Sequence, residues 1–233
     1  MINTKISWCT HSWNPWQGCT HKSEGCDNCY ARRRAERYGV SFVPHSSSEA
    51  TWNLPRSKKV RAGDSVFVCS LSDFFIPAPG ADMWRNRALD IIEDRPDVTF
   101  LILSKRAWSM SYWAKNIREF PPNVWVGVTI ESGTRAERAK VLIDTPVPSG
   151  VRFVSAEPLI EPLALSAHLG PDRISWLIVG GESGPKAREM QRAWVEELSD
   201  EANEAKIPFF FKQWGAASNE TATFRKDKPA CRL

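Results

Sequence analysis

The chain has 233 residues, of which 42% are hydrophobic and 25% are charged, so it fits one domain of enzyme size with a sizeable core. It contains no apolar run of the roughly 18 residues needed to span a bilayer, and MINTKISWCT lacks the order of a signal peptide, so we expect a cytoplasmic protein with no membrane partner. Such a protein keeps its six cysteines reduced, and its net charge of +4 permits a polyanionic partner without requiring one.

The predicted elements begin with a short strand, TKISWC, over residues 4–9, followed by a loop at HSWNPWQG. A helical pattern runs from Asp27 to Gly39, where the glycine provides a C-terminal cap. Residues 40–63 contain prolines, serines and a basic set, and we expect them to form a loop.

Residues 18–31, GCTHKSEGCDNCYA, form a segment that we call the cysteine loop. It sets Cys19, Cys26 and Cys29 in a Cys-x6-Cys-x2-Cys array at the head of the predicted helix. Three thiolates from one short loop can hold a metal ion or a cluster and leave one coordination position without a protein ligand, as catalytic sites do. The helix N-terminus adds a dipole that stabilises thiolates.

Apolar runs alternate with helical segments over the rest of the chain. The runs cover residues 66–73, 99–106, 124–132, 151–161, 176–184 and 208–215, with helices from near Asp82 and over 108–117, 134–143 and 194–205. With the first strand this makes seven strands that are apolar enough to be buried on both faces, which indicates a parallel sheet. We predict an α/β fold, either a doubly wound sheet or a full or partial parallel (β/α) barrel. Residues 1–215 would form a single domain and 216–233 a C-terminal tail.

Sites in parallel α/β folds form at the carboxyl ends of the strands. Here those ends carry Ser70, Ser72, Asp73, Ser104, Lys105, Arg106, Thr129, Glu131, Ser155, Glu157, Gly180, Gly181, Glu182, Lys212 and Gln213. Together with the cysteines they would converge on one rim. A carboxylate that ends an apolar strand is costly to bury unless it is paired or bound, which favours a role in the site for Glu131 and Glu157.

These residues resemble those of radical S-adenosylmethionine (SAM) enzymes, which carry three cluster cysteines after the first strand of a full or partial (β/α)6 barrel. Their usual spacing is Cys-x3-Cys-x2-Cys, so the first gap is longer here; an aromatic residue, Tyr30, adjoins the last cysteine. Over residues 4–215 the chain is similar to small phage and bacterial proteins of radical SAM type. The shared motifs are W-N-P (13–15), G-C-x6-C-x2-C-Y-A (18–31), S-x-S-D (70–73), L-S-K-R (103–106), G-V-T-I-E (127–131), S-A-E-P-L (155–159), G-G-E-S-G (180–184) and F-F-K-Q-W-G (210–215).

The resemblance implies a [4Fe-4S] cluster held by Cys19, Cys26 and Cys29, with SAM on its fourth iron and an electron donor as a partner. Reduction would cleave SAM to a deoxyadenosyl radical that takes a hydrogen atom from the substrate. Ser70, Ser72 and Asp73 would lie near the SAM amino group, Lys105 near its carboxylate, and Glu131 and Glu157 near ribose or substrate. The Gly180-Gly181-Glu182 turn would cradle the cofactor with its backbone amides.

For phage proteins of this type, the resemblance implies an isomerase of DNA hypermodification that serves restriction evasion in the host cytoplasm. It would convert glycine linked through nitrogen at a thymine methyl group into glycine linked through its α-carbon. Glu131, Glu157 and Lys105 would be the catalytic residues. The substrate would be DNA that carries modified thymidine.

Simpler alternatives stay open from the residues alone. His11 or His21 could close a structural zinc site in a nucleic-acid-binding protein without catalysis, and a radical SAM lyase repairing a thymine lesion would use the same chemistry. Arg32, Arg33, Arg34 and Arg37, and the basic set at 56–61, are phosphate contacts or solvated charges. Trp13, Trp16 and Trp52 are core or stacking residues, and Cys69 is a small buried hydrophobe.

Overall fold

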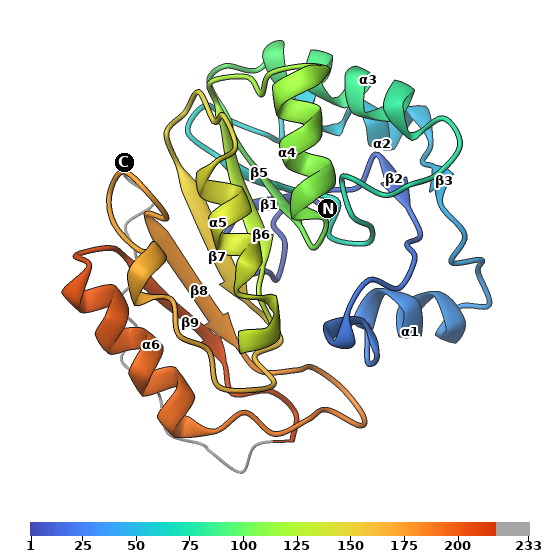
Figure 1. Ribbon diagram of the computed structural model, residues 1–233. Helices are drawn as coiled ribbons and strands as arrows, with labels where there is room; N and C mark the ends of the chain where they lie inside the picture. Colours follow the sequence, from blue (N-terminus) through green and yellow to red (C-terminus); the bar gives the residue numbers. More distant parts are fainter. Residues whose placement is uncertain (218–233) are drawn as a thin grey trace.

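The computed structural model describes residues 1–217, and its main feature is a seven-stranded sheet that is parallel throughout (Figure 1). Its strands are β1 (His11–Trp13), β4 (Ser65–Val68), β5 (Thr99–Ser104), β6 (Val124–Thr129), β7 (Arg152–Ala156), β8 (Trp176–Gly180) and β9 (Phe209–Gln213). They lie side by side in chain order, and the sheet curls into half a barrel flanked by helices. This confirms the predicted α/β fold as a partial parallel barrel. A small antiparallel pair, β2 (Trp16–Gln17) with β3 (His45–Ser46), stands apart from it.

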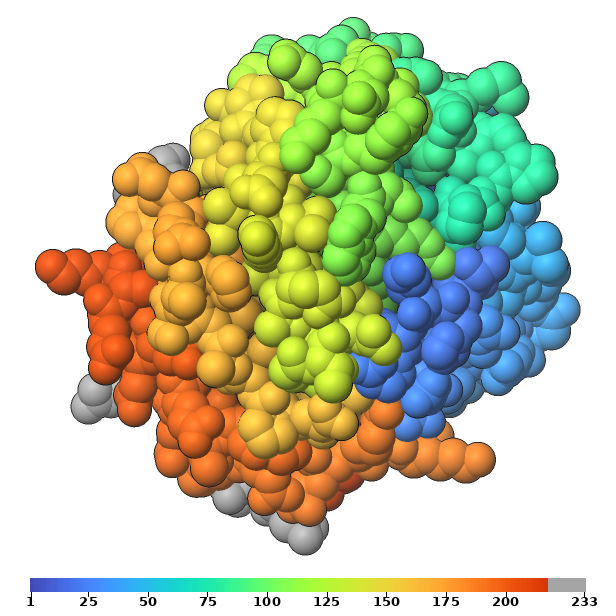
Figure 2. All heavy atoms as spheres, viewed as in Figure 1, coloured from blue at the N-terminus to red at the C-terminus, as the bar shows by residue number. Residues whose placement is uncertain are grey.

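The helices are α1 (Tyr30–Arg37), α2 (Glu49–Trp52), α3 (Ala81–Glu93), α4 (Ala107–Asn116), α5 (Glu137–Ile143) and α6 (Arg192–Glu204). Helices α3 to α6 follow four of the predicted strands and confirm the alternation. Figure 2 shows side chains of α3, α4 and α5 covering one face of the molecule, over the outer side of the sheet. Within the described residues, no helix is long and apolar enough to cross a membrane.

The two faces of the sheet bury different side chains because successive residues of a strand point to opposite faces. The outer face packs β-branched and aliphatic residues against the helices. The inner, concave face carries an aromatic cluster made of Trp8, Phe67, Phe153 and Trp176. The ring of Trp8 lies 4.6 Å from that of Phe67 and 6.2 Å from those of Phe153 and Trp176.

The predicted first strand over residues 4–9 is wrong, since the first strand of the sheet is β1, two residues further on. Residues 4–9 have an apolar pattern because Ile6 and Trp8 pack onto the aromatic cluster inside the half-barrel, not because the segment pairs with a neighbour. The predicted loop after it therefore contains β1 and β2. The number of strands in the sheet is still the seven that were predicted.

Trp13, Trp16 and Trp52 are fully buried, which confirms their use in the core. Cys69 is also buried, as expected of a small hydrophobe. Residues 40–63 are mostly loop but include β3, α2 and a short 3-10 helix, Leu54–Arg56. The predicted C-terminal tail from residue 218 onward lies outside the described residues.

Candidate functional site

A cavity of about 730 Å³ opens at the carboxyl ends of the strands. Its lining includes all three cysteines of the cysteine loop and the predicted residues Ser70, Ser72, Asp73, Lys105, Glu157, Gly181 and Glu182. Trp8 and Phe67 give it an aromatic floor. Of the predicted strand-end residues, Ser104, Glu131, Gly180 and Gln213 do not line it. The fold thus brings residues from distant parts of the chain to one place, as the sequence predicted.

Two glycines shape the cysteine loop. Gly18 has a φ of +84°, and a Cβ there would lie 2.5 Å from the carbonyl oxygen of Val43. Gly25 allows the loop to press against β6, since a Cβ would lie 2.5 Å from Cγ of Glu131. Cys26 ends a short 3-10 helix, and Cys29 is the N-cap of α1, so the helix begins at Tyr30 and not at Asp27 as predicted.

Polar side chains tie the loop to β4 and β5. Asp73 accepts hydrogen bonds from Ser104 Oγ at 2.7 Å and from Arg106 Nη1 at 3.2 Å. Arg106 in turn donates through Nη2 to Thr20 Oγ1 at 2.8 Å. The hydroxyl of Ser72 donates to the carbonyl oxygen of Gly18 at 2.6 Å. Because these donors engage its carboxylate, Asp73 helps to hold the cavity wall together.

Glu131 lies beneath the cavity wall and is fully buried. Its carboxylate pairs with Arg138 Nη1 at 2.7 Å and accepts a hydrogen bond from the hydroxyl of Ser23 in the cysteine loop. Lys105 Nζ lies 3.6 Å from it and reaches the cavity. A buried carboxylate held in this way positions the loop and Lys105, and burial without these partners would be costly.

The loop after β8 docks onto the cysteine loop. Glu182 binds Arg188 Nη2 at 2.7 Å and accepts from Asn28 Nδ2 at 2.9 Å. Although burial raises the pKa of Glu182, its bonds with Arg188 and Asn28 lower it overall. Gly181 is required because a Cβ would lie 2.0 Å from the carbonyl oxygen of Trp214. Its amide already donates to Gln213, so the expectation of free backbone amides fails at that residue.

Glu157 and Lys212 form an ion pair on the cavity wall. Their side chains are 19% and 20% exposed, so both remain open to a ligand. Ser155 is on β7, and its buried hydroxyl lines the cavity and has no hydrogen-bond partner in the described part of the chain. These three side chains supply donors and acceptors for a polar ligand group.

The three thiols line the same cavity, and thiolates are a donor type that binds zinc and iron-sulfur clusters. Burial, followed by the nearby Asp73, raises the pKa of Cys19 to about 12, and Cys26 and Cys29 add to this effect. A bound cation would reverse that preference and favour the thiolates. Over residues 1–217, no three His, Cys, Asp or Glu side chains are grouped tightly enough to hold a metal ion as they stand. Binding therefore requires the thiols to turn toward a common point.

The two histidines of the zinc alternative each have a carboxylate partner. Both ring nitrogens of His11 are engaged, by Asp64 Oδ2 at 2.9 Å and by the amide of Asn3 at 3.0 Å, so His11 is excluded as a fourth ligand. His21 pairs through Nε2 with Asp27 at 2.8 Å. The described cysteines are all free of disulfides.

Sequence reasoning missed two arginines that hold the site together. Arg138 is 1% exposed, and its signal was a basic residue on the apolar side of the helix predicted over 134–143. Arg188 carries no such signal, because its partners Glu182, Asp27 and the Glu24 carbonyl come from two loops that only the fold brings together.

The chain belongs to the family described as "Protein of unknown function (DUF5131)", whose model matches residues 3–233. Comparisons with curated proteins and with solved structures found no match.

Proposed function

We propose that this protein is a radical SAM enzyme that binds a [4Fe-4S] cluster through Cys19, Cys26 and Cys29. The observation that supports this is the shared cavity, which is lined by the three cysteines and by polar residues from the ends of all seven strands. When bound, the cluster and SAM supply a radical that takes a hydrogen atom from the substrate. The volume of about 730 Å³ falls in the upper part of the range for ligand pockets.

The residues of the protein hold and shield the reactants. The aromatic floor of Trp8 and Phe67 excludes water from the inner end of the cavity. Lys105 offers an ammonium group to an anionic part of the cofactor or substrate, and Glu131 fixes its position. Glu157 and Lys212 offer an acceptor and a donor to a polar group of the substrate.

For the substrate we propose DNA that carries N-linked glycinyl-thymidine, with the C-linked isomer as product. In this isomerisation the bond between the thymine methylene carbon and nitrogen breaks and one from that carbon to the glycine α-carbon forms. One hydrogen moves from the α-carbon to nitrogen, so no net oxidant or reductant is needed. The net charge of +4 permits a polyanionic substrate such as DNA.

The test is mass spectrometry of nucleosides from modified DNA incubated with anaerobically reconstituted protein, SAM and a reductant. We expect a product of unchanged mass and altered retention, together with deoxyadenosine in any uncoupled turnover. A thymine product that has lost mass would replace the isomerase with a lyase. If neither nucleosides nor SAM change while DNA binds in a salt-dependent way, the protein is a binding module.

A further inference from the structure

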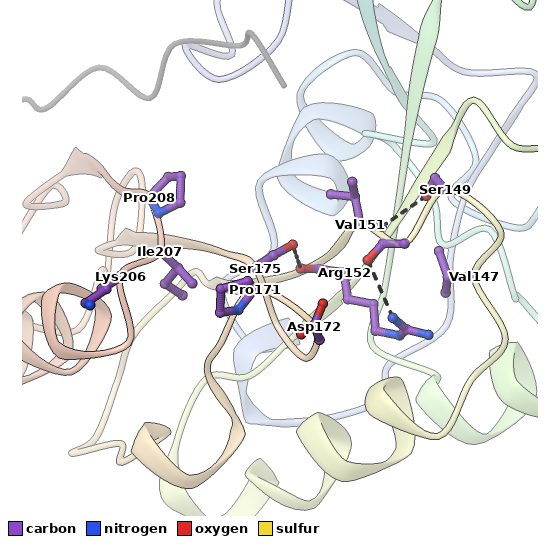
Figure 3. Close-up of a pocket in the computed structure, with 11 residues that line it drawn as sticks. Val147, Ser149, Val151, Arg152, Pro171, Asp172, Ser175, Lys206, Ile207 and Pro208 are labelled. Carbon is purple, nitrogen blue, oxygen red and sulfur yellow. Dashed lines mark hydrogen bonds between the residues drawn. The ribbon is translucent and has the colours of Figure 1, made fainter.

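A second hollow lies at the opposite end of the sheet, where β7, β8 and β9 begin (Figure 3). Its volume is about 630 Å³, which is within the range of small-molecule pockets. We call it the amino-end pocket. It is lined by Val147, Ser149, Gly150, Val151, Arg152, Pro171, Asp172, Ser175, Lys206, Ile207 and Pro208. It shares no residue with the cavity of the candidate site.

Arg152 is a partly buried cation of this pocket whose hydrogen bonds go to backbone carbonyl groups. Its guanidinium donates to the carbonyl oxygens of Thr145 at 3.0 Å and Gly150 at 3.5 Å. Nε is buried without a hydrogen-bond partner, and no carboxylate in residues 1–217 pairs with the guanidinium. Burial lowers the pKa of Arg152, because nothing nearby compensates the charge. A guanidinium has five N-H donors, and only two of them are used in these hydrogen bonds, one on each terminal nitrogen.

The surroundings of Arg152 are mixed in a way that suits an amphipathic anion. Lys206 contributes a second positive charge, against a single carboxylate from Asp172. The remaining walls come mainly from Val147, Val151, Pro171, Ile207 and Pro208. In the view of Figure 3, the Arg152 guanidinium lies between the side chains of Asp172 and Val147. A planar guanidinium binds carboxylate and phosphate through paired hydrogen bonds.

We propose that the amino-end pocket binds a small organic anion, in which a carboxylate or phosphate group pairs with Arg152 and an apolar body rests on the proline and aliphatic wall. Lys206 strengthens the attraction and Asp172 weakens it. This site does not depend on the cysteine loop, so its test stands or falls separately from the proposed enzyme activity.

The test is isothermal titration calorimetry with three probes of similar shape: benzoate, phenyl phosphate and neutral benzamide. We expect one site per chain for at least one of the two anions and none for benzamide. The better anion identifies the head group as carboxylate or phosphate. Arg152→Met should weaken binding at least about tenfold, the size expected for a charge-assisted hydrogen bond.

Further variants protect this test against a folding defect, since Arg152 also holds the backbone at Thr145. Lys206→Met should weaken binding a few-fold and Asp172→Asn should strengthen it; both residues are exposed. The matched control Lys115→Met removes an exposed lysine from α4 and should leave the affinity unchanged. Equal binding of benzamide, no binding of either anion, or unchanged affinity in all three pocket variants would overturn the proposal.

Discussion

The two sides of the candidate cavity differ in how firmly their side chains are held. On the sheet side, the carboxylates of Asp73, Glu131 and Glu182 each pair with an arginine. On the side of the cysteine loop, the three thiols line the cavity but do not yet form a ligand set. The difference indicates that the fold builds the frame of the site by itself. Under the proposed function, the bound cluster would set the final arrangement of the thiols.

The largest effect is expected from removing one thiol. Cys26→Ala should abolish cluster binding and lower activity by more than the roughly 100-fold that loss of an outer-shell partner costs, because two thiolates cannot replace three. Iron analysis and deoxyadenosine formation measure this. Cys9→Ala is the matched control, since Cys9 lies outside the cavity lining. Equal loss in both variants would show that the cysteine loop has no special role.

The buried pair on the sheet side should show the next largest effect. Arg138→Met leaves the fully buried carboxylate of Glu131 without its main counterion and should destabilise the fold by about 3–5 kcal/mol. Urea unfolding measures the change. The double variant with Glu131→Gln should recover part of it, because the unpaired charge is gone. A decrease in unfolding free energy of less than about 1 kcal/mol would show that this ion pair does not hold the frame of the site.

Gly25 joins the two sides, so Gly25→Ala tests how closely they must approach. The new Cβ would lie 2.6 Å from Oε1 of Glu131, and we expect a loss of about 1–3 kcal/mol from overpacking, with weaker metal binding. Gly133→Ala is the control, since its Cβ would meet Pro162 at an ordinary 3.4 Å. Thermal unfolding and metal titration of both variants provide the comparison, and equal behaviour would show that the close approach is unimportant.

The smallest effect concerns Glu24 in the cysteine loop, whose Oε2 lies 2.7 Å from Nη2 of Arg135. The hydrogen bond from Arg135 lowers the pKa of Glu24 from 4.5 to about 2. Because the folded pKa is depressed, this stabilisation is present above pH 4.5 and is lost as the pH falls toward 2. The pair is partly exposed, so it is worth at most about 1 kcal/mol.

Urea unfolding of the wild type and Glu24→Gln should therefore differ at pH 7 and converge at low pH. A difference that persists at about pH 2 would assign the effect to another group.

The sheet and the convergence of its strand ends could be predicted from the sequence, because β-branched runs such as VWVGVT at β6 alternate along the chain with helical segments, which is typical of buried parallel strands. The first strand could not, since the apolar alternation at Ile6 and Trp8 is the same for a strand and for a segment packed on aromatic rings. Local patterns also do not show which arginine meets which carboxylate. Arg188 reaches Glu182 and the Glu24 carbonyl only after both loops have folded.

Metal analysis of the wild-type protein after anaerobic reconstitution with iron, sulfide and competing zinc tests the central claim most directly. The proposed function predicts a brown protein with about four irons per chain, because one [4Fe-4S] cluster would be held by the three thiolates. A colourless protein that holds one zinc per chain would contradict it.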